Sequence, residues 1–142
     1  MSTAIQTRVE FQKLAAMRLA EAKVLLVEGH WSGAYYLAGY AVECALKACI
    51  AKWMQAEVFP DKEFAIKCYT HSIEQLIVLA KLGPLFDAAT AADSAFSDNR
   101  GVVKDWSEKK RYHIINEAEA RELISAIEDG AHGVLSWLKS HW

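Results

Sequence analysis

The stretch 98–113 holds the residues best suited to contact a phosphate. Lys110 and Arg111 stand beside Tyr112 and His113. Across the stretch, five Lys and Arg side chains accompany three Asp and Glu side chains, a local excess of positive charge. Cationic side chains bind phosphates while aromatic rings stack on bases, so this composition is typical of a nucleotide or RNA contact. A solvated charged loop has the same composition, and both interpretations stay open here.

A second group of polar residues lies inside an apolar segment. Tyr36, Tyr40, Glu43 and Lys47 are spaced by four, three and four residues, which places them in one row on a helix. Glu43 stands four residues before Lys47, the favourable order for an ion pair. Arg18 lies in the apolar face of the preceding helix and needs a partner or a path to water, so we expect it near this row. The row is either a polar network that fixes helix register or a ligand-binding or catalytic site.

Neither the histidines nor the cysteines follow a metal-binding pattern. The five histidines lack the His-Glu-x-x-His spacing of a zinc site, and we expect them to be structural or exposed. Cys44, Cys49 and Cys68 form no Cys-x-x-Cys pair, so we expect reduced thiols rather than disulfides or a zinc site. Gly33 and Gly39 lie inside a predicted helix and follow no strand, so they form no phosphate loop. The sequence predicts no metal and no cofactor.

Helical periodicity runs through most of the chain. Apolar residues recur every three to four positions, and no segment alternates as a half-buried strand does. We expect helices over 8–28, 31–55, 72–81, 85–96 and 116–138, a loop over 58–69 and a polar connection over 98–113. The segment 31–55 is apolar on nearly all sides and is predicted to be the central helix. Asn116, with Glu119 three residues on, predicts the start of the last helix.

The predicted fold class is all-α: a single domain over 1–142, folded as an up-and-down antiparallel bundle of four to five helices. With 53% hydrophobic and 24% charged residues, the composition is that of a folded rather than a disordered chain. The formal net charge is -2, so a basic contact surface has to be local. The longest apolar stretch, 33–42, is too short to cross a bilayer, and no signal peptide is recognisable. We therefore expect no membrane contact and a cytoplasmic location.

The segment 34–48 resembles the second helix of HEPN domains. In that family an Ala-rich helix runs into a Glu-x-x-x-Lys step, which is met here at Glu43 and Lys47. Weaker matches are the Gly-His-Trp-Ser turn at 29–32, Thr-His-Ser-Ile at 70–73, Trp106, and Arg111-Tyr112 ahead of the last helix. The resemblance extends over nearly the whole chain.

Membership of the HEPN family implies a helical bundle that commonly forms a dimer. Some members bind nucleotides or act beside a minimal nucleotidyltransferase, often as a toxin and antitoxin pair. Ribonuclease members carry an Arg followed four to six residues later by a His. This chain departs from that pattern, because His113 stands only two residues after Arg111.

Three functions follow from these observations. The first is a HEPN-like homodimeric binding module, not itself an enzyme, for a nucleotide or RNA or for a nucleotidyltransferase partner. Arg111, Tyr112 and Lys110 would contact phosphate, with His113 as a further candidate. The second is a metal-independent ribonuclease in which His113 supplies the base and Arg111 the cation. The third is a structural protein whose bundle surface binds another helix.

Overall fold

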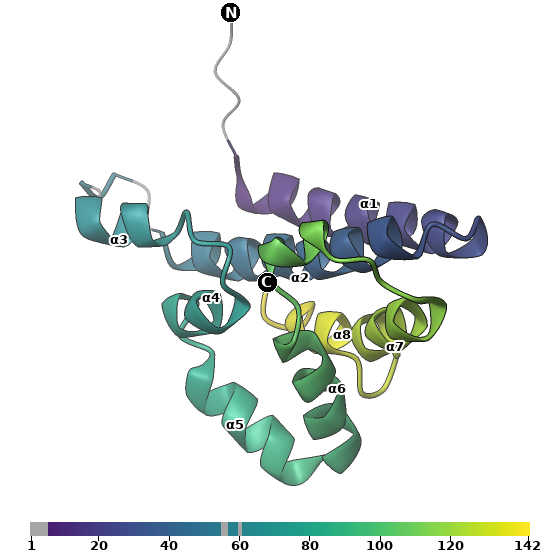
Figure 1. The fold of residues 1–142 in the computed structure, drawn as a ribbon. Helices are drawn as coiled ribbons and strands as arrows, with labels where there is room; N and C mark the ends of the chain where they lie inside the picture. The colour runs from purple at the N-terminus through teal and green to yellow at the C-terminus, as the bar shows by residue number, and fades with distance from the viewer. Residues whose placement is uncertain (1–5, 55–56, 60) are drawn as a thin grey trace, which may run out of the picture.

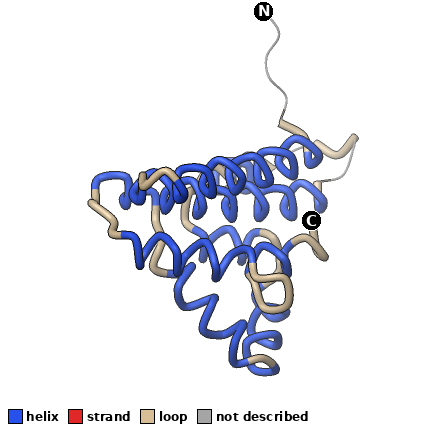
Figure 2. The backbone as a smooth tube through the Cα atoms, turned by 90° about the vertical axis from the view of Figure 1, so that its right-hand side faces the viewer, coloured by secondary structure: helices blue, strands red, loops and turns tan. Residues whose placement is uncertain are grey.

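The computed structural model of the chain describes residues 6–54, 57–59 and 61–142, and it confirms the all-α class. Helices and connecting loops make up this part of the chain, and no strand occurs in it (Figure 2). The elements are α1 (Arg8–Val27), α2 (Trp31–Trp53), α3 (Lys62–Lys67), α4 (Ile73–Leu79), α5 (Gly83–Ala92), α6 (Ser94–Lys104), the 3-10 helix η1 (Glu108–Tyr112), α7 (Glu117–Glu128) and α8 (Val134–Leu138).

The first two helices form a long antiparallel pair, as predicted, and lie side by side in Figure 1. A capping box starts α1: the Thr7 hydroxyl accepts from the Glu10 backbone N–H, and the Glu10 carboxylate accepts from the Thr7 N–H. Gly29 makes the turn to α2 with φ 82°, a conformation in which a side chain would be strained. Ala15 and Ala22 are fully buried, so their small side chains let the two helices approach closely.

The central position predicted for α2 is confirmed. Thirteen of its residues are buried, on all sides of the helix. One side of α2 is covered by α1, while α4, α7 and α8 pack against the other (Figure 1). This helix therefore forms the middle layer of the protein, and any polar group that it carries is placed at an interface between elements.

The connection between α5 and α6 shows that the predicted helix 85–96 is wrong. The chain breaks at Asp93, whose carboxylate accepts from the N–H groups of Ala95 and Phe96 and so starts a new helix. That new helix, α6, extends into the stretch 98–113, where a polar connection is expected. The rest of the stretch contains η1, so the basic residues there lie on a turn of 3-10 helix rather than in an open loop.

Two further predicted boundaries are wrong. The helix expected over 116–138 is interrupted because the Asp129 carboxylate accepts from the N–H groups of Ala131 and His132, which ends α7 before α8 begins. The loop expected over 58–69 contains α3, which starts where the Asp61 carboxylate accepts from the Glu63 N–H. The start at Asn116 is confirmed, since its side chain accepts from the Glu119 N–H at 2.8 Å. The protein consequently has more and shorter helices than four to five.

Residue 55, the end of the predicted helix 31–55, and residue 60, in the predicted loop 58–69, lie outside the described residues, as do residues 1–5 and 56. Within the described ranges, no single helix is long and apolar enough to span a membrane. The pair α4 and α5 reaches the required length and composition together, but the two helices are bent by 112°.

Candidate phosphate-contact surface

Glu43 is the most deeply buried residue of the polar row that Tyr36, Tyr40, Glu43 and Lys47 form on α2. It is 2% exposed and is the one charged side chain of the described residues that is buried. The Lys47 ammonium lies 3.4 Å from the Glu43 Oε2 atom, so the ion pair predicted from their spacing is present. A buried carboxylate is costly unless it is paired and hydrogen-bonded. Lys47, one turn further along the same helix, supplies this pairing.

Arg18 pairs with a residue of its own helix rather than with Glu43. Its guanidinium donates to the Glu21 carboxylate one turn along α1, and the side chain is about a quarter exposed. Its charge still acts on the row, since it lowers the pKa of Tyr40 and Cys44 against the stronger, raising effect of burial. Arg18 therefore lies near the row, and its ion-pair partner is Glu21 rather than Glu43.

His71, which the sequence predicts to be structural or exposed, completes the site. Its Nδ1 atom lies 3.1 Å from both carboxylate oxygens of Glu43. Its Nε2 atom lies 3.5 Å from Oε2 of Glu108 in η1. The imidazole, from the turn before α4, thus bridges the buried carboxylate of α2 and the segment that carries the basic residues. The Thr-His-Ser-Ile match at 70–73 was the available signal, because it places His71 just before a helix cap.

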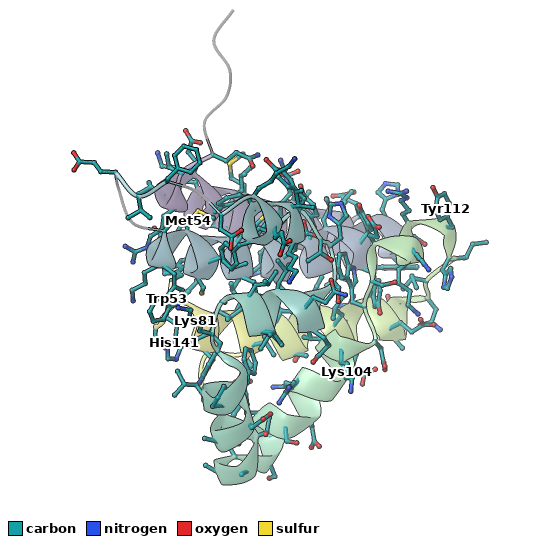
Figure 3. All side chains as sticks on the ribbon, turned by 90° about the vertical axis from the view of Figure 1, so that its left-hand side faces the viewer. Trp53, Met54, Lys81, Lys104, Tyr112 and His141 are labelled. Carbon is teal, nitrogen blue, oxygen red and sulfur yellow. The ribbon has the colours of Figure 1, made fainter. Side chains whose placement is uncertain are left out.

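Arg111 connects η1 to the tyrosine end of the same row. The neighbouring side chains of Tyr112 and Tyr36, together with the charge of Glu108, raise the pKa of the Arg111 guanidinium. The guanidinium carbon lies 4.8 Å from the centre of the Tyr112 ring. Tyr112 is 76% exposed and lies at the outer end of the bundle (Figure 3). A permanent cation and an open aromatic face are therefore presented together.

Trp106 anchors η1 against α2. Its ring is buried and lies 5.9 Å from the ring of Tyr36, centre to centre. It fits there because Gly39 has no side chain: a Cβ atom at Gly39 would lie 2.2 Å from the indole. The indole N–H has no hydrogen-bond partner among the described residues, so packing holds the ring in place. The stacked Tyr36 and Tyr40 rings extend this aromatic surface along α2.

Lys110 and His113 lie close to Arg111 in the sequence, but their side chains form no hydrogen bond with it among the described residues. Lys110 is partly buried in η1, and its carbonyl accepts from the His113 N–H at 2.9 Å. The His113 side chain is exposed, and no hydrogen bond or ion pair among the described residues links it to Arg111. The structure places the Glu43–His71 pair, rather than His113, in the network that reaches η1. No group of three or more metal-ligating side chains occurs in the described ranges.

Comparison of the sequence with models of protein families and with curated proteins, and of the structure with solved structures, found no match. The HEPN resemblance accordingly rests on the residues of this chain.

Proposed function

We propose that this chain is a HEPN-like dimeric binding module that contacts the phosphates of a nucleotide or RNA through Arg111, Tyr112 and Lys110. The observation that carries the proposal is the placement of Arg111, a charged and exposed side chain that lies over the ring of Tyr112. A guanidinium binds phosphate oxygens in a forked geometry, and an exposed ring offers a face for a base. Trp106 and the Glu108–His71 contact fix the backbone that presents both groups.

Binding of a fluorescently labelled single-stranded RNA, followed by anisotropy, tests this proposal. We expect weak binding by the wild type and its loss in Arg111→Ala. Arg121→Ala is the matched control, because Arg121 is an exposed arginine on α7 that pairs with Glu117. His113→Ala should leave binding nearly intact. If no RNA or nucleotide binds even at low salt, the phosphate contact is refuted, and a nucleotidyltransferase or helix partner remains as the target of this surface.

The Glu43–His71 pair favours a second candidate function, a metal-independent ribonuclease. A buried carboxylate that orients an imidazole is a common arrangement for a general base. In such a reaction His71 would take the proton of the 2′-hydroxyl, whose oxygen attacks the phosphorus while the 5′-oxygen leaves. Arg111 would stabilise the extra negative charge at phosphorus. The pair replaces His113 as the source of the base in this candidate.

Incubation of labelled RNA with the protein and a chelator separates the two functions. The binding module predicts intact RNA. Cleavage that survives the chelator, disappears in His71→Ala and Arg111→Ala, and persists in His113→Ala would instead establish the ribonuclease. Cleavage that persists in all three variants would trace to a contaminating nuclease and leave the binding module as proposed.

A further inference from the structure

A cavity of about 310 Å³ opens at the end of the long helices that lies away from the phosphate-contact surface, which consists of Lys110, Arg111 and Tyr112. It lies between the start of α1, the last turns of α2, and α3 with the turn that follows it. Met54, which lines it, and Tyr112 lie at opposite ends of the molecule in Figure 3. The volume is at the lower end of the range of about 300–1,000 Å³ that small-molecule sites occupy.

The walls of this cavity are mainly apolar. They are formed by Phe11, Ile50, Ala51, Met54 and Ala65. Ile50 is buried and Met54 is about half exposed, so the lining runs from the core of the protein to its surface. Apolar walls of this kind favour a ligand with a hydrocarbon or aromatic body.

Among the described residues, Lys47 is the one charged side chain that lines the cavity. Its side chain is 16% exposed, so most of it is covered by protein while water still has some access. Its ion pair with Glu43 is 3.4 Å long, whereas close charge-assisted hydrogen bonds measure about 2.7–2.9 Å. The same carboxylate also faces the His71 ring through both of its oxygens. An ammonium has three N–H donors, so beside the long ion pair with Glu43 it can still donate to a ligand.

The other polar groups of the lining are neutral. Gln6, Cys68 and Tyr69 contribute an amide, a thiol and a phenol. Burial raises the pKa of the Cys68 thiol, while the charge of Lys47 lowers it by less. The thiol is therefore protonated at neutral pH, and the described lining residues include no anion. The one anion that already pairs with Lys47 is Glu43, which does not line the cavity.

We propose that this cavity binds a small monocarboxylate with an apolar tail. The carboxylate accepts hydrogen bonds from the Lys47 ammonium, and the tail packs against Phe11, Ile50 and Met54. The selectivity follows from the lining: an amine of the same length meets a like charge at Lys47, and an alcohol of the same length forms only a neutral hydrogen bond.

Titration calorimetry of the full chain with hexanoate, hexan-1-ol and hexylamine tests the proposal, because these probes share a tail and differ in charge. We expect hexanoate to bind at least about tenfold more tightly than hexanol, since charge-assisted hydrogen bonds are the stronger ones. Hexylamine should not bind. Lys47→Met should remove the preference for hexanoate over hexanol, and Lys47→Arg should keep it.

Two further variants guard against a change in folding. Ala51→Leu fills the cavity and leaves the Glu43–Lys47 pair in place, so it should abolish binding of hexanoate. Lys52→Met is the control, because Lys52 is an exposed neighbour on α2 that does not line this cavity. The proposal is overturned if the wild type binds no hexanoate, if hexanol binds as tightly, or if Ala51→Leu binds as the wild type does. Arg111→Ala should leave hexanoate binding unchanged, so this result is independent of RNA binding.

Discussion

Glu43 joins three elements through one carboxylate. It pairs with Lys47 on its own helix and with His71 from the turn before α4, and His71 in turn reaches Glu108 in η1. Removal of this buried carboxylate leaves its partners without a counter-charge, which is more costly than the net contribution of the pairing to stability. The stability of the phosphate-contact surface therefore depends on a residue that is itself hidden from the ligand.

Glu43→Ala should lower the free energy of unfolding by about 3 kcal/mol, the lower end of the range for a broken buried pair. We expect the lower end because Lys47 is 16% and His71 46% exposed, so water can solvate both partly after the carboxylate is lost. Urea unfolding measures the change. Glu43→Gln, which keeps the side-chain volume, is the control and should cost less. A loss below about 1 kcal/mol in the alanine variant would contradict the buried pairing.

Gly39 is the second residue on which the surface depends. Gly39→Ala places a methyl group 2.2 Å from the Trp106 ring, so the ring and the adjoining η1 have to move. We expect a loss of stability of about 1–3 kcal/mol, the usual cost of overpacking, and weaker RNA binding. Gly101→Ala is the matched control: nothing lies within 4 Å of its added Cβ in α6, and it should stabilise by about 0.5–1 kcal/mol. Equal stability of the two variants would contradict the role of Trp106 as an anchor.

At the level of single residues, sequence patterns predict what is local. The spacing of Glu43 and Lys47 predicts their ion pair, and the composition around Arg111 predicts an exposed cation with an aromatic neighbour. The role of His71 depends on a contact across 28 positions of the chain, and helical periodicity carries no information about such contacts. The same is true of Trp106, whose place against Gly39 is set by the folded structure alone.

The predictions for whole helices fail where an aspartate interrupts an apolar run. Asp93 and Asp129 each accept two backbone N–H bonds and so end one helix or start another. The helical spacing of apolar residues continues across such breaks, which is why the sequence predicts continuous helices over 85–96 and 116–138. Asn116 is predicted correctly because it precedes the apolar pattern instead of interrupting it. The stretch 98–113 reads as a connection because its charged residues outnumber the few apolar ones that α6 buries.

The α5–α6 corner at Asp93 and the α7–α8 turn after Asp129 are connected by hydrogen bonds. The His132 Nδ1 atom lies 2.6 Å from an oxygen of Asp93, which connects the α5–α6 corner to the α7–α8 turn. The Asn99 amide donates to the His132 carbonyl at 2.9 Å. Hydrogen bonding to Asp93 raises the pKa of His132, and the same bond lowers the pKa of Asp93. This pair makes the packing of the two corners depend on pH.

The pH range of this contribution follows from the two shifts. The stabilisation by His132 is fully present below its unfolded pKa of 6.5 and is lost as the pH rises through the raised folded value. The stabilisation by Asp93 is present above its unfolded pKa of 3.8 and is lost as the pH falls through the lowered folded value. We expect the difference in urea midpoint between the wild type and His132→Gln to be largest between pH 3.8 and pH 6.5. A difference that stays constant from pH 5 to pH 9 would show that the pair does not contribute.

At the scale of the whole molecule, the apolar surface of α2 is already covered within one chain by α1, α4, α7 and α8. The apolar side chains that stay exposed on α1 lie on one face of that helix. They are Val9, Met17, Val24 and Val27, which are between 52% and 80% exposed. A second copy in a two-fold contact through this face would cover them.

A homodimer is accordingly expected. Light scattering after gel filtration should give about twice the chain mass of 15.9 kDa. Val24→Glu places a charge in the middle of the exposed α1 face and should shift the protein to the monomer, while the charge-neutral Val24→Thr should shift it less. A monomer at micromolar concentration for the wild type would refute the dimer.

The salt dependence of RNA binding tests the central claim most directly, because each phosphate neutralised by a cation releases counterions. The logarithm of the binding constant should fall linearly with the logarithm of salt concentration for the wild type. Removal of one phosphate contact lowers the magnitude of that slope by about one, so Arg111→Ala should show this decrease while Arg121→Ala keeps the slope of the wild type. A slope unchanged by Arg111→Ala, or equal decreases in both variants, would contradict a phosphate contact at Arg111.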